Sequence, residues 1–132
     1  MCGEGKPSDD QRRLYATAYA QIQRSIELSQ PGVGLREFAE NIGTLPEEYQ
    51  PLRYARIAHG VGLCDEYPTA YWKEDFDEHG WDDVLKSNTT ISVETYIGAV
   101  GGREGVKLEQ QILITEQGPE PISNYPFEED WL

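Results

Sequence analysis

The sequence is poor in sulfur and in positive charge. Its 132 residues include 2 cysteines, 1 methionine and 2 histidines, and 24 acidic residues stand against 11 basic ones. Cys2 and Cys64 have no paired spacing, so we expect no disulfide framework and a reducing, cytoplasmic location. Since no partner makes Cys64 a nucleophile, we expect it to be a small buried residue.

Long hydrophobic runs are absent as well. No apolar stretch approaches the length of a membrane span, and the opening MCGEGKPSDDQRR lacks the hydrophobic core of a signal peptide. A formal net charge of −13 argues against nucleic acid or an anionic membrane as a partner, because both repel an acidic surface. We expect a soluble chain that forms a single domain over residues 1–132.

The first third of the chain carries helix signals. Ser8 followed by Gln11 is typical of a capping box, and Pro31-Gly32 is a stop signal. Between them apolar residues recur at every fourth position, which predicts an amphipathic helix: Leu14, Ala18, Ile22 and Ile26. Residues 35–41 predict a second, shorter helix.

Strand signals follow. Residues 54–63 alternate apolar and polar side chains, and residues 89–98 and 105–115 are rich in β-branched side chains. The last two stretches predict an antiparallel hairpin with a glycine-rich connection. Residues 65–87 are acidic and aromatic without a sustained period, which predicts a loop. Helices followed by antiparallel strands indicate an α+β fold.

Three residues in the predicted strands are candidates for chemistry. Glu94 and Glu109 lie inside apolar strands, where a carboxylate is costly unless it is paired or bound to a cation, and His59 lies near a strand end. Two such carboxylates on neighbouring strands repel each other unless a positive charge lies between them. Histidine with carboxylates suits iron, manganese, zinc or cobalt. The alternative is a solvent-facing strand surface shared by Ser92, Glu94 and Tyr96. The pattern alone leaves both interpretations open.

The order of three motifs carries a family resemblance. HGVGL, VETYIG and GVKLEQQ resemble the C-terminal half of the M24 metallopeptidase-like, or pita-bread, family. The resemblance covers nearly the whole chain. It implies the C-terminal half of a pita-bread domain, with helices packed on an antiparallel sheet.

The resemblance also implies a metal site. It places His59, Glu94 and Glu109 as ligands of a dinuclear metal centre. The two aspartate ligands of the family precede the position of this chain's first helix, where the sequence has only the cap residues Asp9 and Asp10. We therefore expect a chain truncated at its N-terminus that has little or no activity by itself.

One branch of the family shares more of the sequence. The segments are RYARIAHGVGLCDEYP, ISVETYIG, GGREGVKLEQQILITE and PFEED. They resemble the dimethylsulfoniopropionate lyases, which cleave a carbon–sulfur bond to give dimethyl sulfide and acrylate. This resemblance implies iron as the metal, Asp65 as the catalytic base, Tyr54 as a residue lining the site, and a homodimer. The substrate would be a small molecule with a carboxylate and a sulfonium, a cation that aromatic faces bind well.

Two other functions remain open. The first is an Xaa-Pro metallopeptidase of the same fold, although the family's peptidases carry a second histidine after the glycines, where this chain has CDEYP. The second is a non-catalytic pita-bread module that binds a basic protein, which the acidic composition suits.

Overall fold

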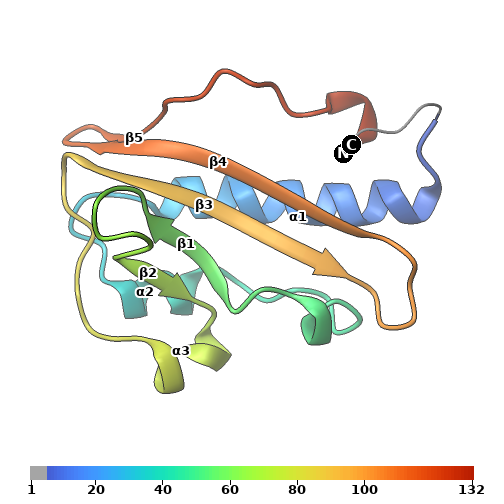
Figure 1. The fold of residues 1–132 in the computed structure, drawn as a ribbon, viewed down its shortest axis with the longest axis horizontal. Helices are drawn as coiled ribbons and strands as arrows, with labels where there is room; N and C mark the ends of the chain where they lie inside the picture. The colour runs from blue at the N-terminus through green and yellow to red at the C-terminus, as the bar shows by residue number, and fades with distance from the viewer. Residues whose placement is uncertain (1–5) are drawn as a thin grey trace.

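The computed structural model describes residues 6–132 and consists of one antiparallel sheet with helices packed on it (Figure 1). Cys2 lies outside the described residues. The strand order is β2-β1-β3-β4-β5. The predicted α+β architecture is confirmed. The strands are β1 (Arg56–Gly60), β2 (Thr69–Tyr71), β3 (Thr89–Gly98), β4 (Gly105–Thr115) and β5 (Gly118–Pro121), and the helices are α1 (Asp9–Leu28), α2 (Leu35–Asn41) and α3 (Lys73–His79).

Helix α1 begins at the predicted capping box. The Gln11 backbone N–H donates to Ser8 Oγ at 3.2 Å, and the Ser8 N–H donates to Gln11 Oε1 at 2.8 Å. In Figure 1 α1 crosses behind β3 and β4, and it contacts both strands. Its buried face includes much of the predicted stripe and closes the core: Leu14, Tyr15, Ala18 and Ile22.

The predicted hairpin of β3 and β4 is confirmed over its whole length. Its register runs from Thr89 opposite Ile114 to Gly98 opposite Gly105. Because side chains alternate along a strand, one face of the hairpin carries buried aliphatic residues such as Ile91 and Ile112. The opposite face carries the two strand glutamates, so the aliphatic core residues and the candidate ligands lie on different faces of the hairpin.

The predicted loop at residues 65–87 is wrong in part, because it contains β2 and α3. Both elements are too short to show a period in the sequence. Their stability comes from tertiary contacts: Ala70 pairs with Ala58 of β1, and Trp72 and Phe76 are only 2% and 3% exposed. The Trp72 indole N–H also donates to the Tyr54 carbonyl at 2.8 Å.

The predicted strand at residues 54–63 is shorter in the structure, where β1 ends at Gly60. The chain then leaves the sheet in a turn that the Asp65 N–H closes by donating to the Gly62 carbonyl at 3.1 Å. This turn projects into solvent, so Cys64 is exposed and its predicted burial is wrong.

The last part of the chain returns along α1 (Figure 1). Strand β5, which the sequence did not predict, pairs with the end of β4, and the following segment packs on α1. The Glu128 N–H donates to the Tyr15 hydroxyl at 2.6 Å, and the Trp131 ring lies 5.6 Å from the Tyr15 ring. Across residues 6–132, no helix has both the length and the apolar character needed to span a bilayer.

Candidate metal centre

Three side chains from three neighbouring strands meet on the face of the sheet opposite the aliphatic core. One ligand atom from each of His59, Glu94 and Glu109 lies within 4.8 Å of the others. The register brings them together, because Glu94 is directly opposite Glu109, and His59 is opposite Ser92. His59 Nε2 lies 3.9 Å from Glu94 Oε1 and 4.0 Å from Glu109 Oε1. The predicted constellation is therefore formed in space.

His59 is oriented by the backbone beside it. Its Nδ1 lies 2.9 Å from the Gly60 carbonyl, a distance at which Nδ1–H donates to that oxygen. With Nδ1 as the donor, Nε2 is the ring nitrogen directed toward the two glutamates. A backbone carbonyl that fixes the tautomer in this way is the usual partner of a metal-ligating imidazole.

The glycine after His59 is required by close packing. A Cβ atom at Gly60 would lie 1.9 Å from the Tyr67 carbonyl oxygen and 2.9 Å from Pro68 Cδ. The Gly60 N–H donates to the Pro68 carbonyl at 2.7 Å. A side chain at this position would push the returning strand away, so the glycine allows the chain to close tightly behind His59.

Glu94 does not lie on a solvent-facing surface. Its side chain is 8% exposed, compared with 16% for His59 and 38% for Glu109. The interpretation of the glutamate as a solvated strand residue is therefore wrong for Glu94. A carboxylate this deeply buried is stable only with hydrogen-bond donors or a cation beside it.

A lysine that the sequence analysis did not single out lies between the glutamates. Lys107 Nζ is 2.9 Å from Glu94 Oε2 and 3.0 Å from Glu109 Oε2. Burial alone would lower the pKa of Lys107, but its hydrogen bonds to the two carboxylates outweigh burial and raise that pKa above its usual value. Alternation along β4 places residues 107 and 109 on one face, so this signal was present in the sequence.

Glu109 is held by a second donor as well. The Ser92 hydroxyl donates to Glu109 Oε1 at 2.6 Å. Burial would raise the pKa of Glu109, but the bonds from Ser92 and Lys107 outweigh it, so this pKa lies below its usual value. Glu109 is therefore held in the charged form that a metal ligand requires.

The donor set fits a divalent transition metal. One imidazole nitrogen and two carboxylates converge around a point where the chain already places a positive charge. Nitrogen and oxygen donors of this kind suit first-row ions without selecting one of them. The residues that could hold the metal are therefore His59, Glu94 and Glu109.

A cleft of about 600 Å³ opens next to the cluster. Tyr54 lies in it, 44% exposed, with its ring 5.1 Å from the Tyr96 ring. Lys107 Nζ is 5.7 Å from the centre of the Tyr54 ring, so this ring already faces a cation. The cleft is lined by Arg53, Tyr54, Ala55, Arg56, His59, Glu66, Glu94 and Lys107.

Asp65 is not brought to this cleft. It is exposed in the turn after β1, with a left-handed backbone at φ 54°. Its neighbour Glu66 lines the cleft instead and forms an ion pair with Arg56. No periodicity in the sequence distinguishes the two acids, because both lie in an irregular turn.

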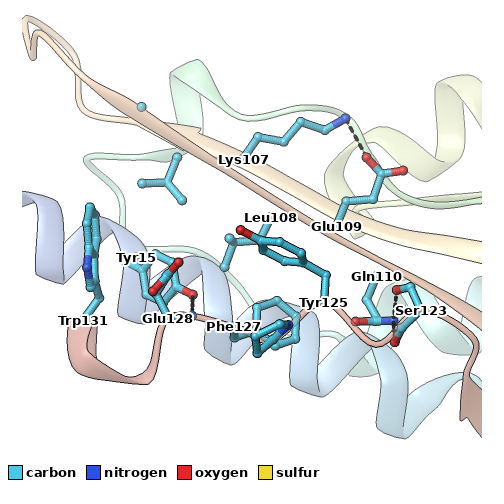
Figure 2. A pocket seen from close by; sticks show the side chains of 13 residues that line it. Tyr15, Lys107, Leu108, Glu109, Gln110, Ser123, Tyr125, Phe127, Glu128 and Trp131 are labelled. Atoms are coloured by element: carbon cyan, nitrogen blue, oxygen red, sulfur yellow. Dashed lines mark hydrogen bonds and ion pairs between the residues drawn. The ribbon is translucent and has the colours of Figure 1, made fainter. Parts of the chain in front are cut away.

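A second groove, of about 420 Å³, lies between β4, α1 and the C-terminal segment. Figure 2 shows the Lys107 and Glu109 side chains pointing away from Tyr125 and Phe127, with Tyr15 and Trp131 further along the groove. The ionic cluster therefore belongs to the opposite side of β4 from these aromatic rings.

Comparison with known proteins agrees with this arrangement. The pattern of metallopeptidase family M24 matches residues 1–116. The chain belongs to this family. M24 enzymes use divalent metals, which agrees with the donor set. The predicted family resemblance is confirmed.

Individual relatives include two kinds of enzyme. The chain is 36% identical over 126 residues to dimethylsulfoniopropionate lyase DddP of Roseovarius nubinhibens, covering 96% of this chain and 28% of the lyase. It is 31% identical over 124 residues to the Xaa-Pro dipeptidase of Pyrococcus furiosus, covering 90% of this chain and 33% of the dipeptidase. The chain thus spans about a third or less of the length of these relatives.

The fold agrees with solved structures of the family. The prolidase from Pyrococcus furiosus superposes with a TM-score of 0.73 at 26% sequence identity, over 93% of this chain and 35% of the prolidase. The X-Pro aminopeptidase from Thermotoga maritima gives a TM-score of 0.68 over 92% of the chain. The predicted pita-bread fold is confirmed.

Proposed function

We propose that the chain forms the metal-binding and cation-binding part of a dimethylsulfoniopropionate lyase. The observation that carries the proposal is the Tyr54 ring, which faces a cation directly beside the His59–Glu94–Glu109 cluster. A ring in this position suits a sulfonium substrate. His79, the other histidine of the sequence, lies on α3 with its ring 5.8 Å from Tyr71, outside the residues that line the cleft. Within residues 6–132, no second histidine of the kind that the family's peptidases use lies beside the cluster.

In the proposed enzyme the metal ligands are His59 Nε2 and the carboxylates of Glu94 and Glu109. Iron is the metal implied by the lyase resemblance, and manganese, zinc and cobalt suit the same donors. A bound divalent ion would supply Lewis acidity toward the substrate carboxylate. Ser92 and the Gly60 carbonyl hold Glu109 and His59 in position for this role.

The chain's own residues supply the remaining steps. Tyr54 binds the sulfonium against its ring face. Asp65 removes a proton from the carbon next to the substrate carboxylate. The electrons of that C–H bond form the double bond of acrylate, and the C–S bonding pair leaves with dimethyl sulfide. Because Asp65 lies in the exposed turn, it acts as base only if the turn folds toward the cleft, and Glu66 is the alternative base already on the cleft wall.

The whole enzyme is proposed to contain more than this chain. The lyase of Roseovarius nubinhibens is matched over 28% of its length. Two aspartate ligands, expected from the family resemblance, would complete the centre from the remaining part. Dimer formation is expected from the same resemblance.

A chimeric lyase tests the proposal. The matched segment of the Roseovarius lyase is replaced by this chain, and dimethyl sulfide and acrylate are measured together with hydrolysis of an Xaa-Pro dipeptide. We expect lyase activity that His59→Ala abolishes and His79→Ala leaves intact. Asp65→Asn and Glu66→Gln identify the catalytic base. The variant that loses turnover and still retains metal marks the residue that removes the proton.

Other outcomes point to other functions. Dipeptide hydrolysis without dimethyl sulfide release would assign the chain to an Xaa-Pro metallopeptidase. A folded chimera that retains no metal and performs neither reaction would support a non-catalytic binding module.

A further inference from the structure

Lys107 occupies an unusual position for a strand lysine. It precedes Glu109 by two residues on the same face of β4, and it is opposite Tyr96 of β3, one pleat from Glu94. Its side chain is 42% exposed, yet the ammonium turns back over the sheet to contact Glu94 Oε2 at 2.9 Å and Glu109 Oε2 at 3.0 Å. Figure 2 shows its contact with Glu109.

The two glutamates need this positive charge. Glu94 and Glu109 are direct cross-strand partners, and like charges in that relation destabilise a sheet. Burial of Glu94 removes the water that would otherwise screen the repulsion. His59 Nε2 approaches the Oε1 atoms at 3.9 and 4.0 Å, whereas Lys107 lies nearer, at hydrogen-bond distance from both Oε2 atoms. Within residues 6–132 Lys107 is thus the cation that holds the pair together.

We propose that Lys107 is a tethered counter-cation, which holds Glu94 and Glu109 in register in the metal-free protein and competes with a metal ion for their carboxylates. The competition follows from geometry. A metal coordinates a carboxylate oxygen at about 2.0–2.2 Å, so the ammonium cannot stay on the same oxygens without strong cation–cation repulsion. Lys107 is a positioning residue that sets how readily the site is filled. This inference rests on the metal centre in the proposed function.

The position of Lys107 allows its ammonium to move from the carboxylates to solvent. Its side chain is partly exposed, and the Tyr54 ring lies 5.7 Å from its ammonium. A flexible four-carbon stem can carry the ammonium from the carboxylates to solvent without movement of β4. Metal binding is therefore expected to exchange one cation for another rather than to reshape the sheet.

The first test needs no metal. A double-mutant cycle with Lys107→Met and Glu94→Gln is measured by urea unfolding in the presence of a chelator. We expect Lys107→Met to lower the unfolding midpoint in the wild-type background and to have a smaller effect when Glu94 is already neutral, because only the contact with Glu109 is then lost. Lys86→Met is the matched control, because Lys86 is 70% exposed and, among residues 6–132, forms an ion pair with Asp83 alone, at 3.7 Å. Equal effects of Lys107→Met in both backgrounds, or an effect no larger than that of the control, would refute the claim that Lys107 holds the two glutamates together.

The second test measures Mn²⁺ binding by the electron paramagnetic resonance signal of the free ion. Removal of a competing cation is expected to tighten binding by at least about fivefold, the lower end of measured coupling between sites, whereas Lys86→Met leaves affinity unchanged. A merely structural role for Lys107 would not raise the affinity. Unchanged or weaker binding by Lys107→Met, or no binding by any variant, would overturn the competition.

The same titration separates this inference from the metal centre. Loss of Mn²⁺ binding in His59→Ala, with equal binding by wild type and Lys107→Met, leaves the centre standing and rejects the role of Lys107. Binding that His59→Ala does not alter rejects the centre itself.

Discussion

Replacement of Gly60 by alanine is expected to destabilise the protein far more than the same replacement at Gly62. The two glycines flank one residue in the segment after His59, and only the first is closely packed. A Cβ atom at Gly60 would lie 1.9 Å from the Tyr67 carbonyl oxygen, whereas one at Gly62 would have no atom within 4 Å. The pair is therefore a matched test of the packing that supports His59.

The magnitude follows from two contributions. Overpacking of this kind costs about 1–3 kcal/mol. The shift needed to relieve it also weakens the bond from the Gly60 N–H to the Pro68 carbonyl, for about 1 kcal/mol more. We expect Gly60→Ala to lower the free energy of unfolding by about 2–4 kcal/mol. Gly62→Ala should change it by no more than about 1 kcal/mol, because the added methyl meets no atom and reduces the conformational freedom of the unfolded chain.

Urea unfolding followed by tryptophan fluorescence measures both variants. For a slope of about 1–3 kcal/mol per molar, Gly60→Ala should lower the midpoint by on the order of 1 M or more. A midpoint for Gly60→Ala that coincides with that of Gly62→Ala would show that the turn yields freely and would refute the packing argument.

Three further predictions concern the same scaffold. Trp72→Phe removes the donor to the Tyr54 carbonyl and should cost about 1–3 kcal/mol in urea unfolding. Ser8→Ala breaks the capping box and should cost about 1 kcal/mol in the same assay. The Val84 N–H and the Tyr67 hydroxyl lower the pKa of Asp83, so its stabilising contribution is present above the unfolded-state pKa and lost as pH falls through the folded one. Asp83→Asn should flatten the acid loss of stability.

The elements predicted correctly are those with local signals. The capping box of α1 and the β-branched runs of β3 and β4 determine structure within a few residues of themselves. Strands β2 and β5 are three and four residues long and gain stability only by pairing with β1 and β4, which no local pattern reveals. The placement of α3 likewise depends on burial of Phe76 against distant residues.

The same distinction between local signals and tertiary contacts applies to the residues of the candidate site. His59, Glu94 and Glu109 were candidates because a carboxylate inside an apolar strand needs a partner. The pattern left a solvated surface open as the alternative, the family resemblance implied that the three are ligands, and the strand register brings them together. Asp65 remains a prediction from resemblance, and the structure places it outside the cleft lining, because the turn after Gly60 directs it into solvent. Lys107 was visible in the alternation of β4, but its bend back to Glu94 depends on the pairing of two strands.

The central claim is that His59, Glu94 and Glu109 form a metal centre, and equilibrium dialysis of Mn²⁺ against the wild-type chain, His59→Ala and His79→Ala tests it most directly. Each variant removes one of the two imidazoles, and the exposed His79 serves as the control. We expect wild type and His79→Ala to retain one equivalent of metal and His59→Ala to retain none. Equal retention by all three proteins, or retention by none of them, would contradict the account.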